Sequence, residues 1–113
     1  MSDLRFMIDR PEIVEVVGEA DRASVHDLRA RLDAILARAG ARVVVDLSAA
    51  TFIDSSTLGL LAVSAKRFGC PRRFAIACPP GEVRIMFELT ALDRVLPLYP
   101  TRAEALAAID GAR

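Results

Sequence analysis

The sequence contains few of the residues on which catalytic and metal sites depend. Its 113 residues include one histidine, two cysteines and no tryptophan. The histidine, His26, falls on the exposed first turn of a predicted helix, so a serine hydrolase would lack its base. There is no G-x-x-x-x-G-K-[ST] loop or G-x-G-x-x-G turn for a nucleotide, and the carboxylates do not cluster at metal-ligand spacing. We therefore expect no enzymatic activity, no metal site and no cofactor.

Net charge and long apolar runs are also missing. Fifteen basic and fifteen acidic residues give a formal charge of +0, so there is no basic excess to attract the phosphates of nucleic acid. No apolar run approaches the roughly 20 residues that span a bilayer, and the first six residues lack the apolar centre of a signal peptide. Cys70 and Cys78 fit neither a zinc pair nor a C-x-x-C motif, and Cys78 is expected to be buried. These absences predict a cytoplasmic protein with no direct contact to nucleic acid or membrane.

Apolar residues are frequent enough for one folded domain over residues 1–113. They make up 53% of the chain, and charged residues make up 27%, as is typical of globular proteins. Periodicity and turn residues predict the order ββαβαβαβα. The predicted strands are 4–9, 13–17, 42–47, 72–78 and 95–98, and the predicted helices are 24–39, 55–68, 82–89 and 101–109. This alternation predicts an α/β fold with a mixed, mostly parallel sheet of about five strands, in which the first two strands form an antiparallel edge.

The first predicted helix has signals at both ends. Ser24, followed three residues later by Asp27, is a candidate N-cap, and Gly40 is a candidate C-terminal stop. Its apolar residues form one stripe at helical spacing, which we expect to be buried. The stripe consists of Val25, Leu28, Leu32, Ile35, Leu36 and Ala39.

Three other local patterns position the remaining elements. Residues 18–21, Gly-Glu-Ala-Asp, are expected to form a turn after the second strand. The strand at 42–47 is apolar on both faces, which is typical of a central strand with helices on each side. Thr101, with Glu104 three residues later, predicts the capped start of the last helix.

A short polar turn connects the strand at 42–47 to the helix at 55–68. Asp54, Ser55 and Ser56 therefore lie where a helix begins, and the free backbone N–H groups there favour negative charge. Asp54 or Ser55 can simply cap the helix. Alternatively, the Ser55 hydroxyl can accept a phosphoryl group, whose charge of about −1.5 to −2 would repel a partner docked on that surface. The two roles are compatible.

The helix at 55–68 has apolar residues on more than one face. The face expected to pack on the sheet consists of Leu58, Leu61, Ala65 and Phe68. Leu60 and Val63 fall on the opposite side, together with Ser56 and Arg67. Their exposure would indicate a docking surface, whereas contact with the helix at 82–89 would make them part of the core. The sequence leaves both interpretations open.

Three segments resemble the STAS-domain anti-sigma factor antagonists of bacteria, and the resemblance covers essentially the whole chain. The first, Gly18-Glu19-Ala20-Asp21, is similar to the family's G-E-L-D turn. The second is Asp46-Leu47-Ser48 leading to Phe52-Ile53-Asp54-Ser55-Ser56-Thr57-Leu58-Gly59. The third is Leu92–Tyr99 followed by Thr101 and Glu104-Ala105-Leu106, similar to the family's last strand and helix. The resemblance implies a single STAS domain.

The resemblance also implies a regulatory switch that works by partner exchange. In such proteins an anti-sigma factor, itself a serine kinase of the histidine-kinase-like ATPase type, phosphorylates the serine that matches Ser55. The unmodified form binds the anti-sigma factor and frees the sigma factor, phosphorylation ends this binding, and a serine phosphatase can reset it. Ser56 and Thr57 are alternative acceptors. The expected docking surface consists of Gly18, Glu19, Asp21, Phe52, Asp54, Ser56, Thr57, Leu60, Val63 and Arg67.

One position departs from the family pattern. The family's usual glycine after the second hydroxyl residue is Thr57 here, which adds a methyl group and a third hydroxyl and needs an ordinary backbone conformation. This departure favours an alternative function, in which the chain is a STAS module that never cycles through phosphate and serves as a scaffold or ligand sensor in a larger complex. A small-molecule enzyme would need convergent polar groups in a cleft, and the sequence indicates none.

Overall fold

A computed structural model describes residues 11–69 and 72–110. The strands in these ranges are β1 (Glu12–Glu15), β2 (Gly18–Ala20), β3 (Val43–Asp46), β4 (Ala50–Ile53), β5 (Phe74–Ala77) and β6 (Leu98–Tyr99). The helices are α2 (Arg22–Leu36), α3 (Ser55–Phe68), α4 (Glu82–Leu89), the 3-10 helix η1 (Leu92–Arg94) and α5 (Arg102–Asp110). The predicted α/β fold is confirmed, whereas the strand predicted at 4–9 lies outside the described residues.

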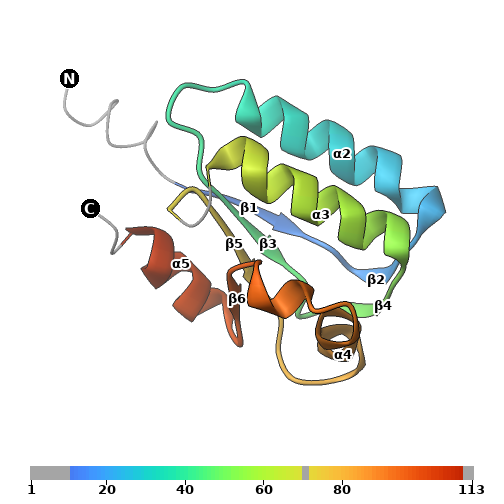
Figure 1. Cartoon of the computed structure of the whole chain (residues 1–113). Coiled ribbons are helices and arrows are strands. Elements are labelled where there is room, and N and C mark those ends of the chain that lie inside the picture. The colour runs from blue at the N-terminus through green and yellow to red at the C-terminus, as the bar shows by residue number, and fades with distance from the viewer. Residues whose placement is uncertain (1–10, 70–71, 111–113) are drawn as a thin grey trace.

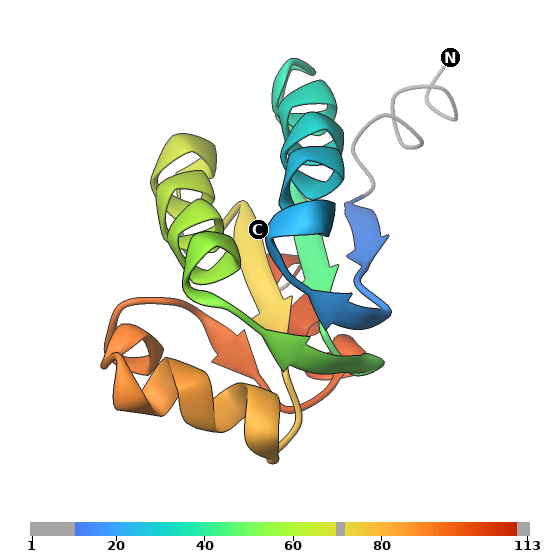
Figure 2. The same cartoon turned by 90° about the vertical axis from the view of Figure 1, so that its right-hand side faces the viewer.

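Strand pairing is parallel throughout the described ranges. β1, β3, β5 and β6 form a four-stranded sheet in that order, and β2 and β4 form a separate two-stranded sheet. Figure 1 shows α2 and α3 side by side over one face of the larger sheet, with α5 on the other face. α4 packs against β4. In Figure 2, β2 and β4 lie next to each other beneath the first turns of α2 and α3.

The central strand β3 is buried on both faces, as predicted. Val45 belongs to the core cluster that includes the buried side chains of α2 and α3, whereas Val44 packs with Ala105 and Ile109 of α5. Successive side chains of a strand point to opposite faces. Because helices cover both faces of this sheet, β3 is apolar up to its last residue, Asp46, and its neighbour β5 is apolar throughout.

α2 begins earlier than predicted, because its N-cap is Asp21 and not Ser24. The Asp21 carboxylate accepts hydrogen bonds from the backbone N–H groups of Ala23 and Ser24. In return, the Ser24 hydroxyl accepts a hydrogen bond from the backbone N–H of Asp21 at 3.0 Å. Ser24, not Asp27, therefore completes the capping box from the N3 position.

α2 also ends earlier than predicted. Its last residue is Leu36, and a turn follows as far as Gly40, whose φ of 69° is a left-handed conformation that favours glycine. Ala39 lies in this turn and is exposed, so its place in the predicted buried stripe is wrong. The helical part of the stripe is buried at Val25, Leu28, Leu32 and Ile35.

β2 and β4 occupy positions predicted as turns. Gly18–Ala20 pairs with Ala50–Ile53, and the pairing continues when the backbone N–H of Asp54 donates to the carbonyl oxygen of Ala20 at 3.0 Å. Gly18 keeps a left-handed φ of 78°, and the register shifts next to it. Both predictions are wrong because pairing with a distant strand outweighs weak local propensity.

The strand predicted at 95–98 is shorter and begins later. The backbone N–H of Leu96 donates to the carbonyl oxygen of Leu92 at 2.8 Å, so the turn of η1 continues to Leu96. Only Leu98–Tyr99 reaches β5 and pairs with it. Val95 therefore lies on the surface instead of in a strand.

The other predicted helices are confirmed. α3 and α4 span the predicted residues, and α5 begins directly after Thr101. The Thr101 hydroxyl accepts a hydrogen bond from the backbone N–H of Glu104 at 3.1 Å, as a capping box requires.

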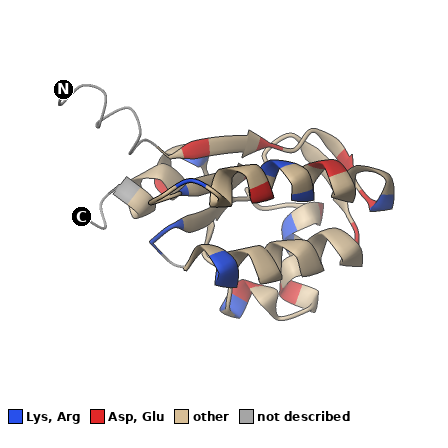
Figure 3. Cartoon of the chain, turned by 90° about the horizontal axis from the view of Figure 1, so that it is seen from above, with Lys and Arg blue, Asp and Glu red and all other residues tan. Residues whose placement is uncertain are grey.

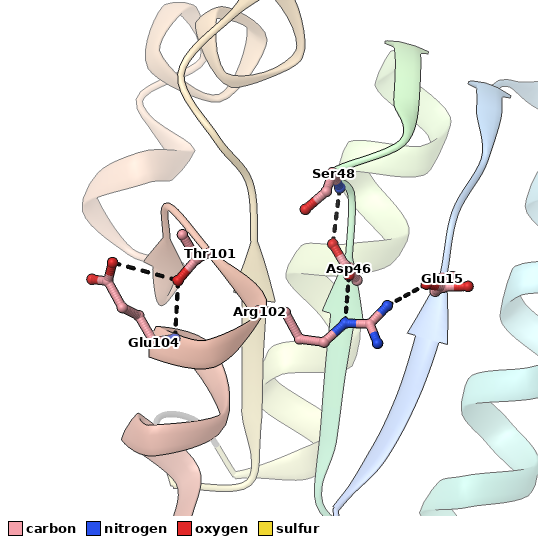
Figure 4. Close-up of polar contacts among 6 residues, drawn as sticks. All are labelled: Glu15, Asp46, Ser48, Thr101, Arg102 and Glu104. Carbon is pink, nitrogen blue, oxygen red and sulfur yellow. Dashed lines mark hydrogen bonds and ion pairs between the residues drawn. The ribbon is translucent and has the colours of Figure 1, made fainter.

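A largely buried carboxylate connects α5 to the sheet (Figure 4). Nε of Arg102 donates to Asp46 at the end of β3 at 2.7 Å, and Nη2 of Arg102 pairs with Glu15 of β1. Asp46 also accepts the backbone N–H of Ser48 at 2.9 Å. Burial alone would raise the pKa of Asp46, but the hydrogen bonds from Ser48 and the contact with Arg102 outweigh it and hold this pKa below its ordinary value.

Removing the Arg102 side chain should destabilise the fold at neutral pH, and the effect should be smaller at acid pH. Arg102→Ala leaves the Asp46 carboxylate with fewer partners, so we expect the midpoint of urea unfolding to fall at neutral pH. Folding lowers the pKa of Asp46. The contribution of ionised Asp46 to the free energy of unfolding is therefore fully present above the ordinary carboxyl pKa of about 3.9, and it is lost as the pH falls through the lower pKa that Asp46 has in the folded protein. Urea unfolding across this pH range measures the difference.

Arg94→Ala provides the matched control, because Arg94 is an exposed arginine of η1. Its effect on the free energy of unfolding should stay within about 0.5 kcal/mol. A loss in Arg102→Ala that does not change with pH would contradict the role assigned to Asp46.

Candidate functional site

The two segments predicted to border the docking surface come together at the first turns of α2 and α3. The register of the β2–β4 pair places Glu19 opposite Phe52. Each of these strands is followed directly by an aspartate that caps a helix, Asp21 for α2 and Asp54 for α3. Two helix N-termini, each with a carboxylate, therefore lie next to each other.

Asp54 holds the start of α3. Its Oδ1 accepts the backbone N–H of Thr57 at 3.0 Å and the hydroxyl of Ser56 at 2.8 Å. The hydrogen bond from the Thr57 backbone is the largest cause of the lowered pKa of Asp54, and the Ser56 hydroxyl and the backbone N–H of Arg22 lower this pKa further. Asp54 is therefore ionised at neutral pH. The cap belongs to Asp54, which decides between the two caps that the sequence allowed.

Ser55 is the first residue of α3 and is exposed. Since the capping hydrogen bonds are made by Asp54, the Ser55 oxygen is not needed to hold the helix start. Ser56 is exposed as well, but its hydroxyl donates to Asp54. Ser55 is therefore an exposed hydroxyl residue that takes no part in the cap.

Thr57 lies inside the protein. It is fully buried, and its hydroxyl donates to the carbonyl oxygen of Ala20 at 3.0 Å. The same oxygen accepts the backbone N–H of Asp54. Thr57 therefore connects α3 to β2, and in this conformation it can neither accept a phosphoryl group nor contact a partner.

The predicted outward face of α3 is wrong for Leu60 and right for Val63. Leu60 is 5% exposed, whereas Val63 is 54% exposed. Arg67 lies two turns after Leu60 on the same side of α3, and it pairs with Asp33 of α2 at 2.8 Å. Leu60 thus faces α2 and belongs to the core, and Arg67 lies at the far end of α3 from Ser55.

Residues near the two helix starts form what we call the candidate docking surface: Gly18, Glu19, Asp21, Phe52, Asp54, Ser55 and Ser56, with Val63 further along α3. Sequence reasoning missed Arg22, whose backbone N–H acts on Asp54. Its position directly after the cap Asp21 was the available signal. Figure 3 shows that α3 carries charge only near its end, where Lys66 and Arg67 lie in the last turn.

Cys78 is buried, as predicted, and burial raises the pKa of its thiol to about 11. The thiol is therefore protonated at neutral pH. Cys70 lies outside the described residues. In the described part of the chain, no helix has the length and apolar character needed to cross a membrane.

The fold is that of one known domain class. Residues 7–105 match the family model of the STAS domain, and the chain therefore belongs to the STAS domain family.

Within this family the chain is similar to anti-sigma factor antagonists. It is 27% identical to the anti-sigma-F factor antagonist RsfB of Mycobacterium tuberculosis over 101 residues. These aligned residues cover 89% of this chain and 83% of RsfB. The crystal structure of an anti-sigma factor antagonist from Mycobacterium paratuberculosis superposes with a TM-score of 0.79 at 34% identity, covering 87% of this chain and 84% of that one. SpoIIAA in its unphosphorylated form gives a TM-score of 0.71 at 23% identity, with coverage of 91% and 90%, and this likeness shows the fold alone.

Substitutions of Asp54 should separate the geometry of the cap from its charge. Asp54→Ala removes the acceptor for the Thr57 backbone, and we expect the free energy of unfolding to fall by about 1 kcal/mol. Asp54→Asn keeps a side-chain oxygen at the same place, so its loss should be no more than a few tenths of a kcal/mol. Urea denaturation followed by circular dichroism measures both. If the asparagine variant loses as much as the alanine variant, the carboxylate charge and not the hydrogen bond stabilises the helix start.

Proposed function

We propose that the unmodified protein binds an anti-sigma factor and thereby releases a sigma factor, and that phosphorylation of Ser55 ends this binding. The observation that carries the proposal is the exposed Ser55 at the first turn of α3, within the candidate docking surface. The names of the relatives, antagonists of anti-sigma factors, support the identity of the partner.

The electrostatics of the helix start support a switch by charge. The exposed N-terminal part of α3 contains hydroxyl and apolar side chains next to the ionised Asp54. A phosphoryl group on Ser55 would add about −1.5 to −2 charges there. An anti-sigma factor fitted to the unmodified surface would then meet like-charge repulsion and an unpaired, partly desolvated dianion.

The fold supports a change of surface without a change of structure. Asp54 caps α3, and Thr57 holds it to β2, so the hydrogen bonds of the helix start do not involve the Ser55 oxygen. The free N–H groups of a helix N-terminus also tolerate a phosphate. The modified protein would thus keep its fold and lose only its affinity for the partner.

The phosphate would come from the partner. We propose that the anti-sigma factor is a serine kinase of the histidine-kinase-like ATPase type, that ATP and Mg²⁺ bind to it, and that a serine phosphatase resets Ser55. This protein acts in the cytoplasm as the substrate of these enzymes and catalyses no reaction itself. Its regulatory effect passes through protein contacts and not through nucleic acid.

The departure at Thr57 does not favour the scaffold alternative once its position is known. Its methyl group and hydroxyl are buried, and its backbone is helical. The substitution therefore leaves Ser55 on the surface, where a switch requires it.

The acceptor can be identified by phosphorylation of single variants. We expect the cognate serine kinase with ATP to add one phosphoryl group to the wild-type protein and none to Ser55→Ala, as measured by intact mass spectrometry. Ser56→Ala is the matched control, because Ser56 is the neighbouring exposed hydroxyl and should not be needed. Phosphate retained in Ser55→Ala and lost in Ser56→Ala would assign the acceptor to Ser56 instead.

Binding of the anti-sigma factor should depend on the charge at position 55. Ser55→Asp should weaken the affinity at least about tenfold, which corresponds to roughly 1.4 kcal/mol. Asparagine has nearly the same shape as aspartate but no charge, so Ser55→Asn should bind the anti-sigma factor almost as well as the wild type. Isothermal titration calorimetry measures both affinities. Equal losses in the two variants would show that size and not charge controls docking.

A further inference from the structure

α4 has an apolar outer face that the fold leaves open. Val83 and Phe87 are buried in the core, whereas Ile85 and Leu89, one turn apart on the other side, are 47% and 75% exposed. We call Ile85 and Leu89 the α4 patch. It shares no residue with the candidate docking surface, and Figure 2 shows α4 apart from α2 and α3.

A pair of opposite charges borders the patch. Arg84 and Glu88 lie one turn apart on the same flank of α4, and Nε of Arg84 is 3.7 Å from Oε2 of Glu88. Arg84 also donates from Nη1 to the carbonyl oxygen of Cys78 at 3.1 Å. Along this flank the helix therefore presents a positive and then a negative side chain.

We propose that the α4 patch binds the same patch of a second copy of this chain, with the two α4 helices antiparallel about a two-fold axis level with Met86. Such an axis keeps the same flanks of the two helices side by side. It places Arg84 of each copy level with Glu88 of the other, while Ile85 and Leu89 of both copies form the apolar centre. A parallel arrangement, whose two-fold axis runs along the helices, would place the two Arg84–Glu88 flanks on opposite sides of the contact, where their charges do not meet. The charge order of α4 is thus complementary to itself in the antiparallel orientation, which favours a second copy as the occupant.

The size of the contact sets the expected strength. α4 has eight residues, so the interface belongs to the small class, below about 1,200 Å² of total buried area. We expect a dissociation constant on the order of micromolar or weaker. The dimer would leave both candidate docking surfaces free, and it does not depend on the function proposed above.

Sedimentation velocity of the full chain, from micromolar to near-millimolar concentration, tests the dimer. The mean mass of the wild type should rise from monomer towards dimer. Leu89→Glu should raise the dissociation constant at least about tenfold, because it buries a carboxylate in the apolar centre. Val63→Glu, an equivalent change on the exposed face of α3, should leave the dimer unchanged. A wild type that stays monomeric, or a dimer lost in Val63→Glu and kept in Leu89→Glu, would overturn the proposal.

Charge exchange tests the antiparallel orientation. Glu88→Arg places Arg against Arg84 of the other copy and should weaken the dimer several-fold. The double variant Arg84→Glu with Glu88→Arg restores opposite charges and should return the dissociation constant to near the wild-type value. Because Arg84 and Glu88 also pair within one chain, an equimolar mixture of Glu88→Arg and Arg84→Glu, which restores opposite charges only between copies, separates the interface from folding and should form the dimer more strongly than either variant alone. A double variant as weak as Glu88→Arg would rule out this register.

Discussion

The site depends on the parallel pairing of β2 with β4, and the carbonyl oxygen of Ala20 is the centre of that pairing. This oxygen accepts the backbone N–H of Asp54 and the buried hydroxyl of Thr57, each at 3.0 Å. Both donors belong to the start of α3, while Ala20 leads directly into the cap of α2. Two helices that are distant in sequence therefore begin at fixed positions relative to each other. Without this pairing, the segments around Gly18 and Phe52 would not share a surface.

In this arrangement the residues that hold the start of α3 are different from Ser55, the residue proposed to accept the phosphoryl group. Asp54 and Thr57 use their side chains to fix the backbone, so the intervening Ser55 remains exposed and unconstrained by the cap. Under the proposed function, a phosphoryl group on Ser55 would change the charge of the surface while the hydrogen bonds beneath it persist.

On the opposite face of the sheet, an ion pair holds α5 in place. β3 is apolar up to its last residue, Asp46, and the carboxylate of Asp46 binds Arg102 of α5. The apolar run of β3 predicted a central strand, but no local pattern connected Asp46 with a residue so far along the chain.

The burial of Leu60 was likewise not predicted by a local pattern. Its position on the helix was read from periodicity alone, and only the ion pair of Arg67 with Asp33 shows that this side of α3 faces α2.

The sequence by itself determined the elements that local forces specify. The α3 and α4 bounds, the cap at Thr101 and the buried central strand follow from side-chain spacing and from hydrogen bonds within a few residues. The tertiary structure alone decided the β2–β4 pairing, the late start of β6 and the burial of Thr57. Their partners are distant in sequence, and weak local propensity yields to long-range backbone hydrogen bonds. Ser55 was found from its motif, but the surface around it exists only because two strands meet.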